Sequence, residues 1–216
     1  MSAWPAVLWW YAAAGLLAYL AGAVPCGYLV AKARGVDIRT VGSGNVGATN
    51  VFRAVGKGWG VLTFFCDALK GFLPVWLLPP LLAHMSGSVS EPILALLCAV
   101  MAVAGHNWPV YLRFKGGKGV ATSAGALLAI APGATGVGVA VWLLVFLITR
   151  YVSMASISAA AAVAGAVWFS SVPLITALML NLLGAVIIWR HRANIQRLRH
   201  GTELRAGGLP RTPESK

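Results

Sequence analysis

Long apolar runs alternate with short polar segments along this chain. Between Ser2 and Ala31 no side chain is ionisable, and a helix of that length crosses the roughly 30 Å hydrocarbon core of a bilayer with residues to spare. Six further apolar runs follow, at residues 59–85, 92–112, 119–131, 136–149, 154–169 and 172–189. The last four are shorter than the usual span of about 20 residues, and a run of 13 residues such as 119–131 crosses only if it lies in a thinned bilayer or belongs to a broken helix. The pattern predicts an all-α integral membrane protein with about seven transmembrane helices.

The few charged residues are mostly basic and lie in alternate connections. The chain has 216 residues, 59% of them hydrophobic, with 17 Lys and Arg against 5 Asp and Glu, whereas soluble domains are about 25% charged. This composition excludes a soluble domain and predicts no nucleic-acid partner. All the basic residues except Lys70 lie in segments 32–57, 113–118 and 190–216 or at Arg150. By the positive-inside rule the N-terminus is expected outside and the C-terminus in the cytoplasm, which requires an odd number of spans.

We expect a single polytopic domain over residues 1–216, with a flexible cytoplasmic tail at 204–216. The three cysteines, Cys26, Cys66 and Cys98, lie within apolar runs, where a thiol usually behaves as a small hydrophobic group. The sequence therefore predicts no disulfide, no metal site and no bound cofactor.

The first basic connection carries a glycine-rich segment suited to an anion. It reads G-S-G-N-V-G-A-T-N at residues 42–50, with Arg53 shortly after. The G-x-G-x-x-G spacing does not indicate a dinucleotide site, because such a site needs a preceding strand and here membrane helices flank the glycines. Glycines let backbone N–H groups approach a phosphate, while Ser, Asn and Thr side chains and an arginine add further donors. The alternative is a flexible turn that only joins two helices.

The second basic connection combines glycines with lysines at the start of the fourth apolar run. Residues 113–123 read R-F-K-G-G-K-G-V-A-T-S, and the match to a Walker A loop fails because Lys118 is followed by Gly119 rather than Ser or Thr. Backbone N–H groups, the helix dipole and an ammonium group would still favour an anion. The alternative is that Arg113, Lys115 and Lys118 only set the topology or touch anionic lipid.

Two oppositely charged residues lie inside the second apolar run. Asp67 and Lys70 are three positions apart and so share one helical face. At that depth in a membrane an unpaired carboxylate is expensive. We expect the two side chains to pair or to face a polar cavity, and a structural ion pair is favoured over direct catalysis.

The segment after the last apolar run places polar side chains on one helical face. In H-R-A-N-I-Q-R-L at residues 191–198, His191 and Asn194 share a face and can point into the cytoplasmic mouth of the bundle. Ser153 lies at the same predicted end, at the start of another apolar run. The alternative is a solvated basic helix end.

Five motifs in order carry a resemblance that covers nearly the whole chain. They are G-S-G-N-V-G-A-T-N-V-F-R at 42–53, D-A-L-K-G at 67–71, G-H-N-W-P-V-Y-L-R-F-K-G-G-K-G-V-A-T at 105–122, R-Y-V-S at 150–153 and H-R-A-N-I-Q-R-L at 191–198. Together they resemble the bacterial membrane family of acyl-phosphate:glycerol-3-phosphate acyltransferases. The resemblance implies a seven-helix fold and transfer of a fatty acyl group from acyl phosphate to the 1-hydroxyl of glycerol 3-phosphate. The products would be lysophosphatidic acid (1-acylglycerol 3-phosphate) and phosphate, in the first acylation step of phospholipid biosynthesis.

The resemblance also implies roles for individual residues. Glycerol 3-phosphate would be held by Arg53, Lys118, Ser153, His191 and Asn194. Acyl phosphate would be held by Ser43, Gly44, Asn45, Gly47, Thr49, Asn50, Gly116 and Gly117. The site would be supported by Asp67, Lys70, His106 and Glu203, and its catalytic residues would be Ser43, Lys118 and His191.

The implied location is the bacterial cytoplasmic (inner) membrane, which the chain would cross several times with its active site on the cytoplasmic face. The expected partners are the two small-molecule substrates and membrane lipid. Contact with the soluble phosphate acyltransferase that forms acyl phosphate would suit the reaction, although no motif in the sequence indicates it.

The proton acceptor stays open at the level of sequence. Acyl phosphate is an activated mixed anhydride, so its own phosphate is expected to take the hydroxyl proton while Ser43, Lys118 and backbone N–H groups stabilise developing charge. His191 as a general base and Ser43 as a covalent nucleophile are the alternatives.

A transporter of an organic phosphate is the competing class of function. A carrier places its site near the bilayer midplane and often shows an internal repeat. The polar motifs of this chain cluster at one predicted face, and the sequence contains no evident repeat. The pattern therefore favours an enzyme.

Overall fold

Every regular element in the described part of the chain is a helix. The structure is a computed structural model, and it describes residues 4–207. Its α-helices are α1 (Trp4–Ala23), α2 (Cys26–Ala33), α3 (Ala48–Ala54), α4 (Lys57–Ser86), α5 (Glu91–Asn107), α6 (Val120–Ile130), α7 (Pro132–Thr149), α8 (Val152–Ala166), α9 (Leu174–Arg190) and α10 (Arg192–Arg199). Two short 3₁₀ helices are η1 (Val110–Leu112) and η2 (Val167–Phe169). All seven predicted apolar runs form helices, the first and third with a short break, and the prediction of an all-α fold is confirmed.

The helices differ in whether they are long enough to cross a bilayer. Among the described residues, five segments meet the length and hydropathy of a span: Val7–Ala33, Lys57–Ser86, Glu91–Leu112, Pro132–Thr149 and Val152–Phe169. The pair α9 and α10, bent by 53°, makes a sixth if it is one span. The remaining predicted run forms α6, which has 11 residues, or about 16 Å at 1.5 Å per residue. The count of seven crossings stays a prediction, because it needs α6 to cross as a short or broken span.

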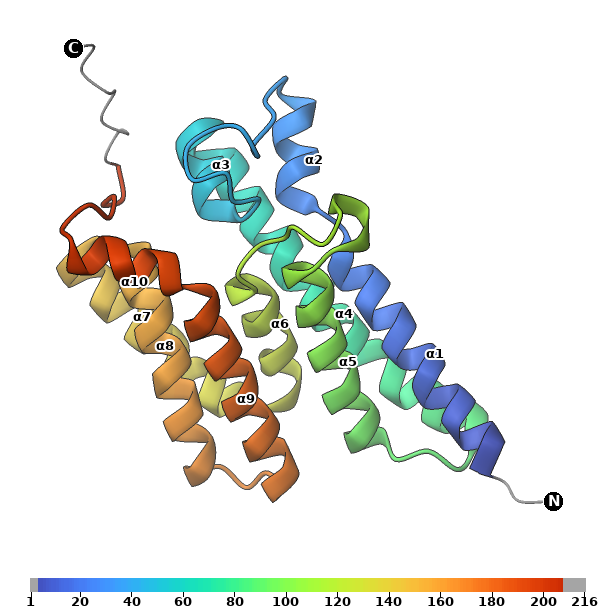
Figure 1. Cartoon of the computed structure of the whole chain (residues 1–216). Helices are drawn as coiled ribbons and strands as arrows, with labels where there is room; N and C mark the ends of the chain where they lie inside the picture. The colour runs from blue at the N-terminus through green and yellow to red at the C-terminus, as the bar shows by residue number, and fades with distance from the viewer. Residues whose placement is uncertain (1–3, 208–216) are drawn as a thin grey trace, which may run out of the picture.

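The helices form two groups that lie side by side (Figure 1). In the first group α1 packs against α5 and α4, and α4 packs against α6; in the second, α8 lies between α7 and α9. Glycines bring backbones close together: Gly22 of α1 meets the Ala102 carbonyl of α5, and Gly71 of α4 meets the Thr122 carbonyl of α6. A Cβ at either glycine would collide with that carbonyl. Such contacts of small residues are typical of helices packed within membranes.

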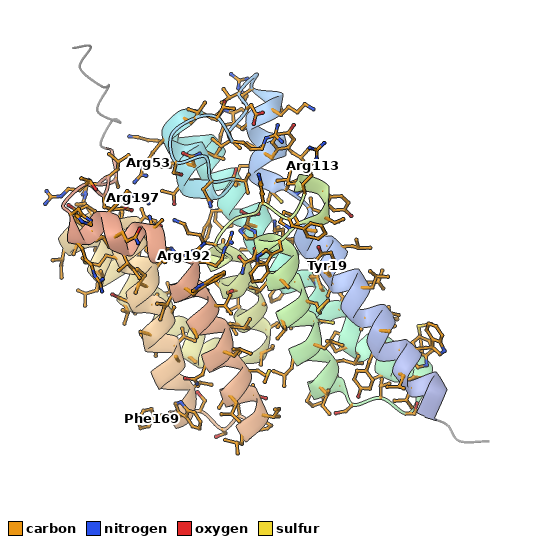
Figure 2. The ribbon with its side chains drawn as sticks, in the orientation of Figure 1. Tyr19, Arg53, Arg113, Phe169, Arg192 and Arg197 are labelled. Carbon is orange, nitrogen blue, oxygen red and sulfur yellow. The ribbon has the colours of Figure 1, made fainter. Side chains whose placement is uncertain are left out.

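One end of the bundle gathers the polar connections, and we call it the basic end. α2, α3, α10 and the α5–α6 connection lie there, whereas α1 begins at the opposite end, where the α4–α5 and α8–α9 connections also lie (Figure 1). Figure 2 shows Arg53, Arg113, Arg192 and Arg197 at the basic end and Phe169 at the other. The basic connections thus share one end of the fold, as the predicted topology requires.

Candidate active site

The loop before α3 is folded around one buried asparagine. Asn50 is 3% exposed. Its Nδ2 donates to the carbonyls of Ile38, Val41 and Asn45 at 2.9 to 3.1 Å. Its Oδ1 accepts the Ser43 N–H at 3.1 Å. These contacts engage both polar atoms of the amide and show that Asn50 shapes the loop, while its predicted contact with acyl phosphate stays a prediction.

The tip of the same loop is exposed. Gly42 and Gly44 have φ of 62° and 67°, a left-handed conformation that glycine adopts without strain. Ser43 lies between them, is exposed, and its hydroxyl forms no hydrogen bond within residues 4–207. The Gly47 N–H donates to Asn45 Oδ1 at 2.9 Å. The loop therefore presents the Ser43 hydroxyl on a turn whose shape is fixed by hydrogen bonds to the side chains of Asn50 and Asn45.

The α5–α6 connection packs closely over the end of α5. Gly116 and Gly117 lie against His106, and a Cβ at either position would collide with it. The Gly117 N–H also donates to the His106 carbonyl at 3.1 Å. Gly119, with φ of 79°, precedes the first turn of α6. This run of glycines is therefore required by packing and by backbone conformation, and it carries Lys118 to the N-terminus of α6.

Three ionisable side chains form a buried cluster beneath this connection. The predicted pairing of Asp67 with Lys70 is present: Lys70 Nζ lies 2.8 Å from Asp67 Oδ1. The same ammonium donates to the Val24 carbonyl at 2.6 Å, and His106 Nδ1 lies 3.6 Å from Asp67 Oδ1. The cluster therefore supports the imidazole on which the glycine loop packs.

Lys118 belongs to a chain of polar contacts that joins four elements. Its Nζ donates to Asn194 Oδ1 at 2.5 Å, and Asn194 Nδ2 donates to Glu203 Oε1 at 2.7 Å. Ser153 Oγ donates to the same Oε1 at 2.7 Å, while Arg197 Nε lies 2.7 Å from Glu203 Oε2. The structure thus brings together residues from the start of α6, the start of α8, α10 and the segment after it.

Arg53 reaches the same region through the C-terminal segment. Its Nη2 donates to the Leu204 carbonyl at 2.9 Å, and the Ala206 N–H donates to the Arg150 carbonyl at 2.7 Å. Residues 204–206 are therefore held against the basic end. The rest of the predicted tail, from residue 208 onward, lies outside the described residues.

Burial lowers the pKa of the two central cations. It is the largest cause of the lowering of the pKa of Lys118 to about 8; Glu203 opposes this shift, and Arg197 and Arg53 add to it. Burial likewise lowers the pKa of the Arg53 guanidinium. For Glu203 burial alone would raise the pKa, but the hydrogen bonds it accepts outweigh burial and lower it. The site therefore holds one ionised carboxylate among several cations.

His191 is buried in the bend between α9 and α10. Its Nδ1 lies 2.8 Å from the Ile187 carbonyl, and because a carbonyl only accepts, Nδ1 carries the proton. Burial, followed by repulsion from Lys118, lowers the pKa of His191 to about 4. The imidazole is therefore neutral at pH 7, with the lone pair on Nε2.

An apolar cavity begins at the basic end and extends into the bundle. Its volume is about 560 Å³, and α3, α4, α6, α7, α8 and α9 contribute to its walls. At the basic end its lining includes Thr49, Arg53 and Ala206, and further in it includes Leu127 and Leu180. A volume of this order accommodates a flexible hydrocarbon chain. The cavity thus adjoins the cluster of cations.

Comparison with known proteins shows the family to which this chain belongs. A profile of the glycerol-3-phosphate acyltransferase family matches residues 12–201. The glycerol-3-phosphate acyltransferase of Aquifex aeolicus is 46% identical over 190 residues, 88% of this chain and 96% of that protein. The Thermus thermophilus relative of the same name is 46% identical over 197 residues, 89% of this chain and 93% of that protein. This chain belongs to the glycerol-3-phosphate acyltransferase family.

Solved members of the family have the same fold. Two crystal structures of PlsY (YgiH), an integral membrane glycerol 3-phosphate acyltransferase, match 90% of this chain and 94% of theirs. The glycerol 3-phosphate form gives a TM-score of 0.81 at 45% identity, and the lysophosphatidic acid form gives 0.79 at 44%. This member of the glycerol-3-phosphate acyltransferase family is therefore a multi-pass integral membrane protein.

Two arginines of this acyltransferase-family chain contact predicted site residues, and reasoning from sequence did not single them out. Arg197 pairs with Glu203, and Arg190 donates to the backbone of the glycine loop. In the sequence both stand out only as basic residues of the predicted cytoplasmic end. A signal existed for Arg197, because Glu203 is the only carboxylate near the C-terminal basic run apart from Glu214. By contrast, Arg113 and Lys115 are exposed and do not join the hydrogen-bonded group.

Proposed function

We propose that this protein transfers a fatty acyl group from acyl phosphate to the 1-hydroxyl of glycerol 3-phosphate, releasing 1-acylglycerol 3-phosphate and phosphate. Membership of the glycerol-3-phosphate acyltransferase family supports the acceptor. So do the glycerol 3-phosphate and lysophosphatidic acid forms of PlsY, which correspond to acceptor and product. The observation that carries the proposal is the junction at the basic end, where a cluster of cations meets an apolar cavity of about 560 Å³.

Glycerol 3-phosphate is assigned to the hydrogen-bonded group around Asn194. Lys118 and Ser153 are linked to it directly or through Glu203. A phosphate would offer Lys118 and Arg53 an acceptor that carries charge, which the Asn194 oxygen and the Leu204 carbonyl do not. Hydrogen bonds to charged acceptors are roughly twice as strong as neutral ones. The cations of this group thus favour a phosphate-bearing acceptor.

Acyl phosphate is assigned to the two glycine loops, with its chain in the apolar cavity. The phosphate would lie near Ser43, Gly44, Asn45, Gly47, Gly116 and Gly117, and Asn50 would act by shaping the first loop. Thr49 connects the two parts, because it follows the loop and also lines the cavity. Each methylene removed from water contributes about 0.8 kcal/mol. The cavity therefore supports a donor with a long fatty chain.

The chemical step needs no carboxylate base. The 1-hydroxyl oxygen attacks the acyl carbonyl carbon, the bond from that carbon to the phosphate oxygen breaks, and the hydroxyl proton passes to the departing phosphate. The departing oxygen becomes more basic as this bond breaks, so the donor supplies its own proton acceptor. Lys118, Ser43 and backbone N–H groups would stabilise the developing negative charge.

His191 is assigned to orienting the acceptor. Its neutral ring leaves Nε2 free to accept a hydrogen bond from a glycerol hydroxyl, since Nδ1 is held by the Ile187 carbonyl. General bases work best when their pKa lies near the operating pH, and the pKa of His191 is about 4. Orientation of the hydroxyl therefore suits this imidazole better than proton abstraction does.

We place the enzyme in the bacterial inner membrane with the basic end toward the cytoplasm. The gathering of Lys and Arg at that end supports this orientation by the positive-inside rule. Both substrates would then enter from the cytoplasm. The soluble enzyme that forms acyl phosphate is the partner that this placement suits.

The deciding experiment supplies the purified protein in lipid nanodiscs with glycerol 3-phosphate and one acyl donor at a time. We expect lysophosphatidic acid from acyl phosphate and none from acyl-CoA or acyl carrier protein. Product from either of the latter but not from acyl phosphate would reject the donor assignment, and no product from any donor would reject the function. Mass spectrometry of rapidly quenched enzyme tests whether transfer is direct. An acyl group found on Ser43 would reject direct transfer in favour of a covalent intermediate.

A further inference from the structure

Within residues 4–207, Arg190, at the C-terminal end of α9, donates hydrogen bonds only to backbone carbonyls and lies over one aromatic ring. Its Nε and Nη2 both donate to the Gly117 carbonyl, and Nη2 also reaches the carbonyls of Gly116 at 3.1 Å and Asn107 at 3.4 Å. The guanidinium carbon lies 5.6 Å from the centre of the Trp108 ring. Within the described residues, no carboxylate lies within 4.0 Å of this arginine. Its charge is therefore directed at the α5–α6 connection and not at an acid.

These contacts determine which way the peptide between Gly117 and Lys118 faces. In a trans peptide the carbonyl and the following N–H point in opposite directions. With the Gly117 carbonyl held by Arg190, the Lys118 N–H must point to the other side of the loop. That N–H has no acceptor within residues 4–207. The amide is therefore a donor available to an anion, at the start of a helix whose dipole also favours negative charge.

The same bend of α9 and α10 holds the next residue of the loop by its side chain. Asn194, one helical turn beyond Arg190, accepts Lys118 Nζ at 2.5 Å. Two successive loop residues, Gly117 and Lys118, are thus fixed by positions 190 and 194, with His191 between them. The bend sets the position of the glycine loop relative to the imidazole assigned to the acceptor.

Only an arginine can make this set of contacts from one position. Its planar fork offers several N–H groups in fixed directions and stacks on an aromatic ring, whereas a lysine ammonium is a point charge on a flexible stem. Three carbonyls and one ring surround the guanidinium here. A lysine at position 190 would keep the charge but not the full geometry.

We propose that Arg190 is a positioning residue that orients the 116–118 backbone to bind the phosphate of acyl phosphate and holds this loop in register with His191. The assignment of that phosphate to the loop rests on the proposed function. Arg190 acts through the backbone and is not expected to touch either substrate.

The test compares Arg190→Met and Arg190→Lys with the parent and with a matched control, Arg192→Met. Arg192 lies two residues away, is exposed, and stacks on Trp189 without touching the glycine loop. Steady-state kinetics are measured for each substrate in turn, and amide hydrogen exchange is followed by mass spectrometry for peptides covering 113–122 and, as a reference, α1 and α4.

For Arg190→Met we expect the KM for acyl phosphate to rise about ten- to a hundredfold, as for other small misplacements of a binding group. The KM for glycerol 3-phosphate should rise less than the KM for acyl phosphate, because Lys118 keeps its own hydrogen bond to Asn194. Exchange should increase at 113–122 and stay unchanged in α1 and α4. For Arg190→Lys, the KM for acyl phosphate and the exchange at 113–122 should lie between the values of the parent and of Arg190→Met. For Arg192→Met both should match the parent.

Three results would overturn the proposal. A rise in the KM for glycerol 3-phosphate alone would make Arg190 a direct ligand of the acceptor. Increased exchange throughout the protein, with unchanged kinetics of the folded fraction, would make it a general stabiliser. Unchanged exchange at 113–122 would show that it does not hold the loop. Because exchange needs no turnover, this last reading decides the proposal even if the parent protein has no acyltransferase activity, an outcome that would reject the proposed function separately.

Discussion

The lowered pKa of Lys118 predicts that enzyme activity falls as the pH rises, and that this fall begins at a lower pH than a free lysine would give. Burial and the surrounding arginines place its pKa at about 8, against 10.5 for a free side chain. The ammonium exists below that pKa and is lost above it. Since the proposed role of Lys118 is to bind and stabilise phosphate charge, the affinity for substrate should fall as pH rises through 8.

The size of the fall follows from the fraction of enzyme that remains charged. One unit above the pKa about one tenth of the free enzyme keeps its ammonium, so kcat/KM for glycerol 3-phosphate should be about tenfold lower at pH 9 than below pH 7. A bound dianion favours the charged form and raises the pKa in the complex. The kcat at saturating substrate should therefore fall at a higher pH than kcat/KM does.

The same shift predicts how stability depends on pH. Because the pKa of Lys118 is lower in the folded than in the unfolded state, the unfolded chain binds more protons between pH 8 and 10.5, and stability rises with pH in that window. A shift from 10.5 to about 8 corresponds to about 3 kcal/mol of cost to the folded protein below pH 8. Lys118→Met should therefore raise the unfolding temperature at pH 7 while abolishing activity.

The assay is the initial rate of lysophosphatidic acid formation between pH 6 and 10, corrected for spontaneous hydrolysis of acyl phosphate. Lys118→Arg is the control, because a guanidinium stays charged across this range. We expect a lower rate for this variant but no alkaline fall near pH 8. If the fall persists in Lys118→Arg, another group causes it and the reasoning about Lys118 is refuted.

Three further changes test the other parts of the site. Asp67→Asn leaves Lys70 as an unpaired buried charge and should lower the free energy of unfolding by about 3 to 5 kcal/mol, and adding Lys70→Met should restore most of that loss. Thermal unfolding in one detergent measures both variants, and equal stability of Asp67→Asn and the parent would contradict the pairing. Asn50→Ala removes the centre of the first loop and should lower kcat/KM for acyl phosphate by at least about tenfold with the KM for glycerol 3-phosphate unchanged; the reverse pattern would reassign this loop to the acceptor. Ala159→Phe, which narrows the apolar cavity, should shift the donor preference to shorter chains by about fourfold in kcat/KM per methylene excluded; an equal loss at every chain length would place the fatty chain elsewhere.

The apolar helices and their common polar end were predictable from the sequence because they depend on composition. A membrane span needs a continuous apolar run, and basic residues collect on one side of the membrane. Both features can therefore be recognised from the order of the residues. The interruption at Pro25, which divides the first run into α1 and α2, was not predicted. A proline inside an apolar run is compatible with either a kinked or a broken span, and packing decides between them.

The roles of single polar residues were less predictable because they depend on distant contacts. Lys118 and Asn194 are 76 positions apart, and Arg190 meets a carbonyl 73 positions away. No local pattern brings these groups together. Asn50 shows a second limit: its type and position suggested a ligand for phosphate, but its side chain is used within its own loop. An asparagine with donors and an acceptor serves either purpose, and only the folded loop distinguishes them.

The excess of positive charge at the basic end has a physical explanation in the proposed pair of substrates. Arg53, Lys118 and Arg197 lie around one carboxylate, Glu203, and their mutual repulsion contributes to the lowered pKa of Lys118. Holding buried charges without full compensation costs free energy in any fold. Two phosphorylated substrates would supply the missing negative charge, so binding would relieve the repulsion that the protein bears alone. The residues that weaken the folded protein are therefore the ones that provide affinity and charge stabilisation in the reaction, which explains why Lys118→Met should gain stability and lose activity together.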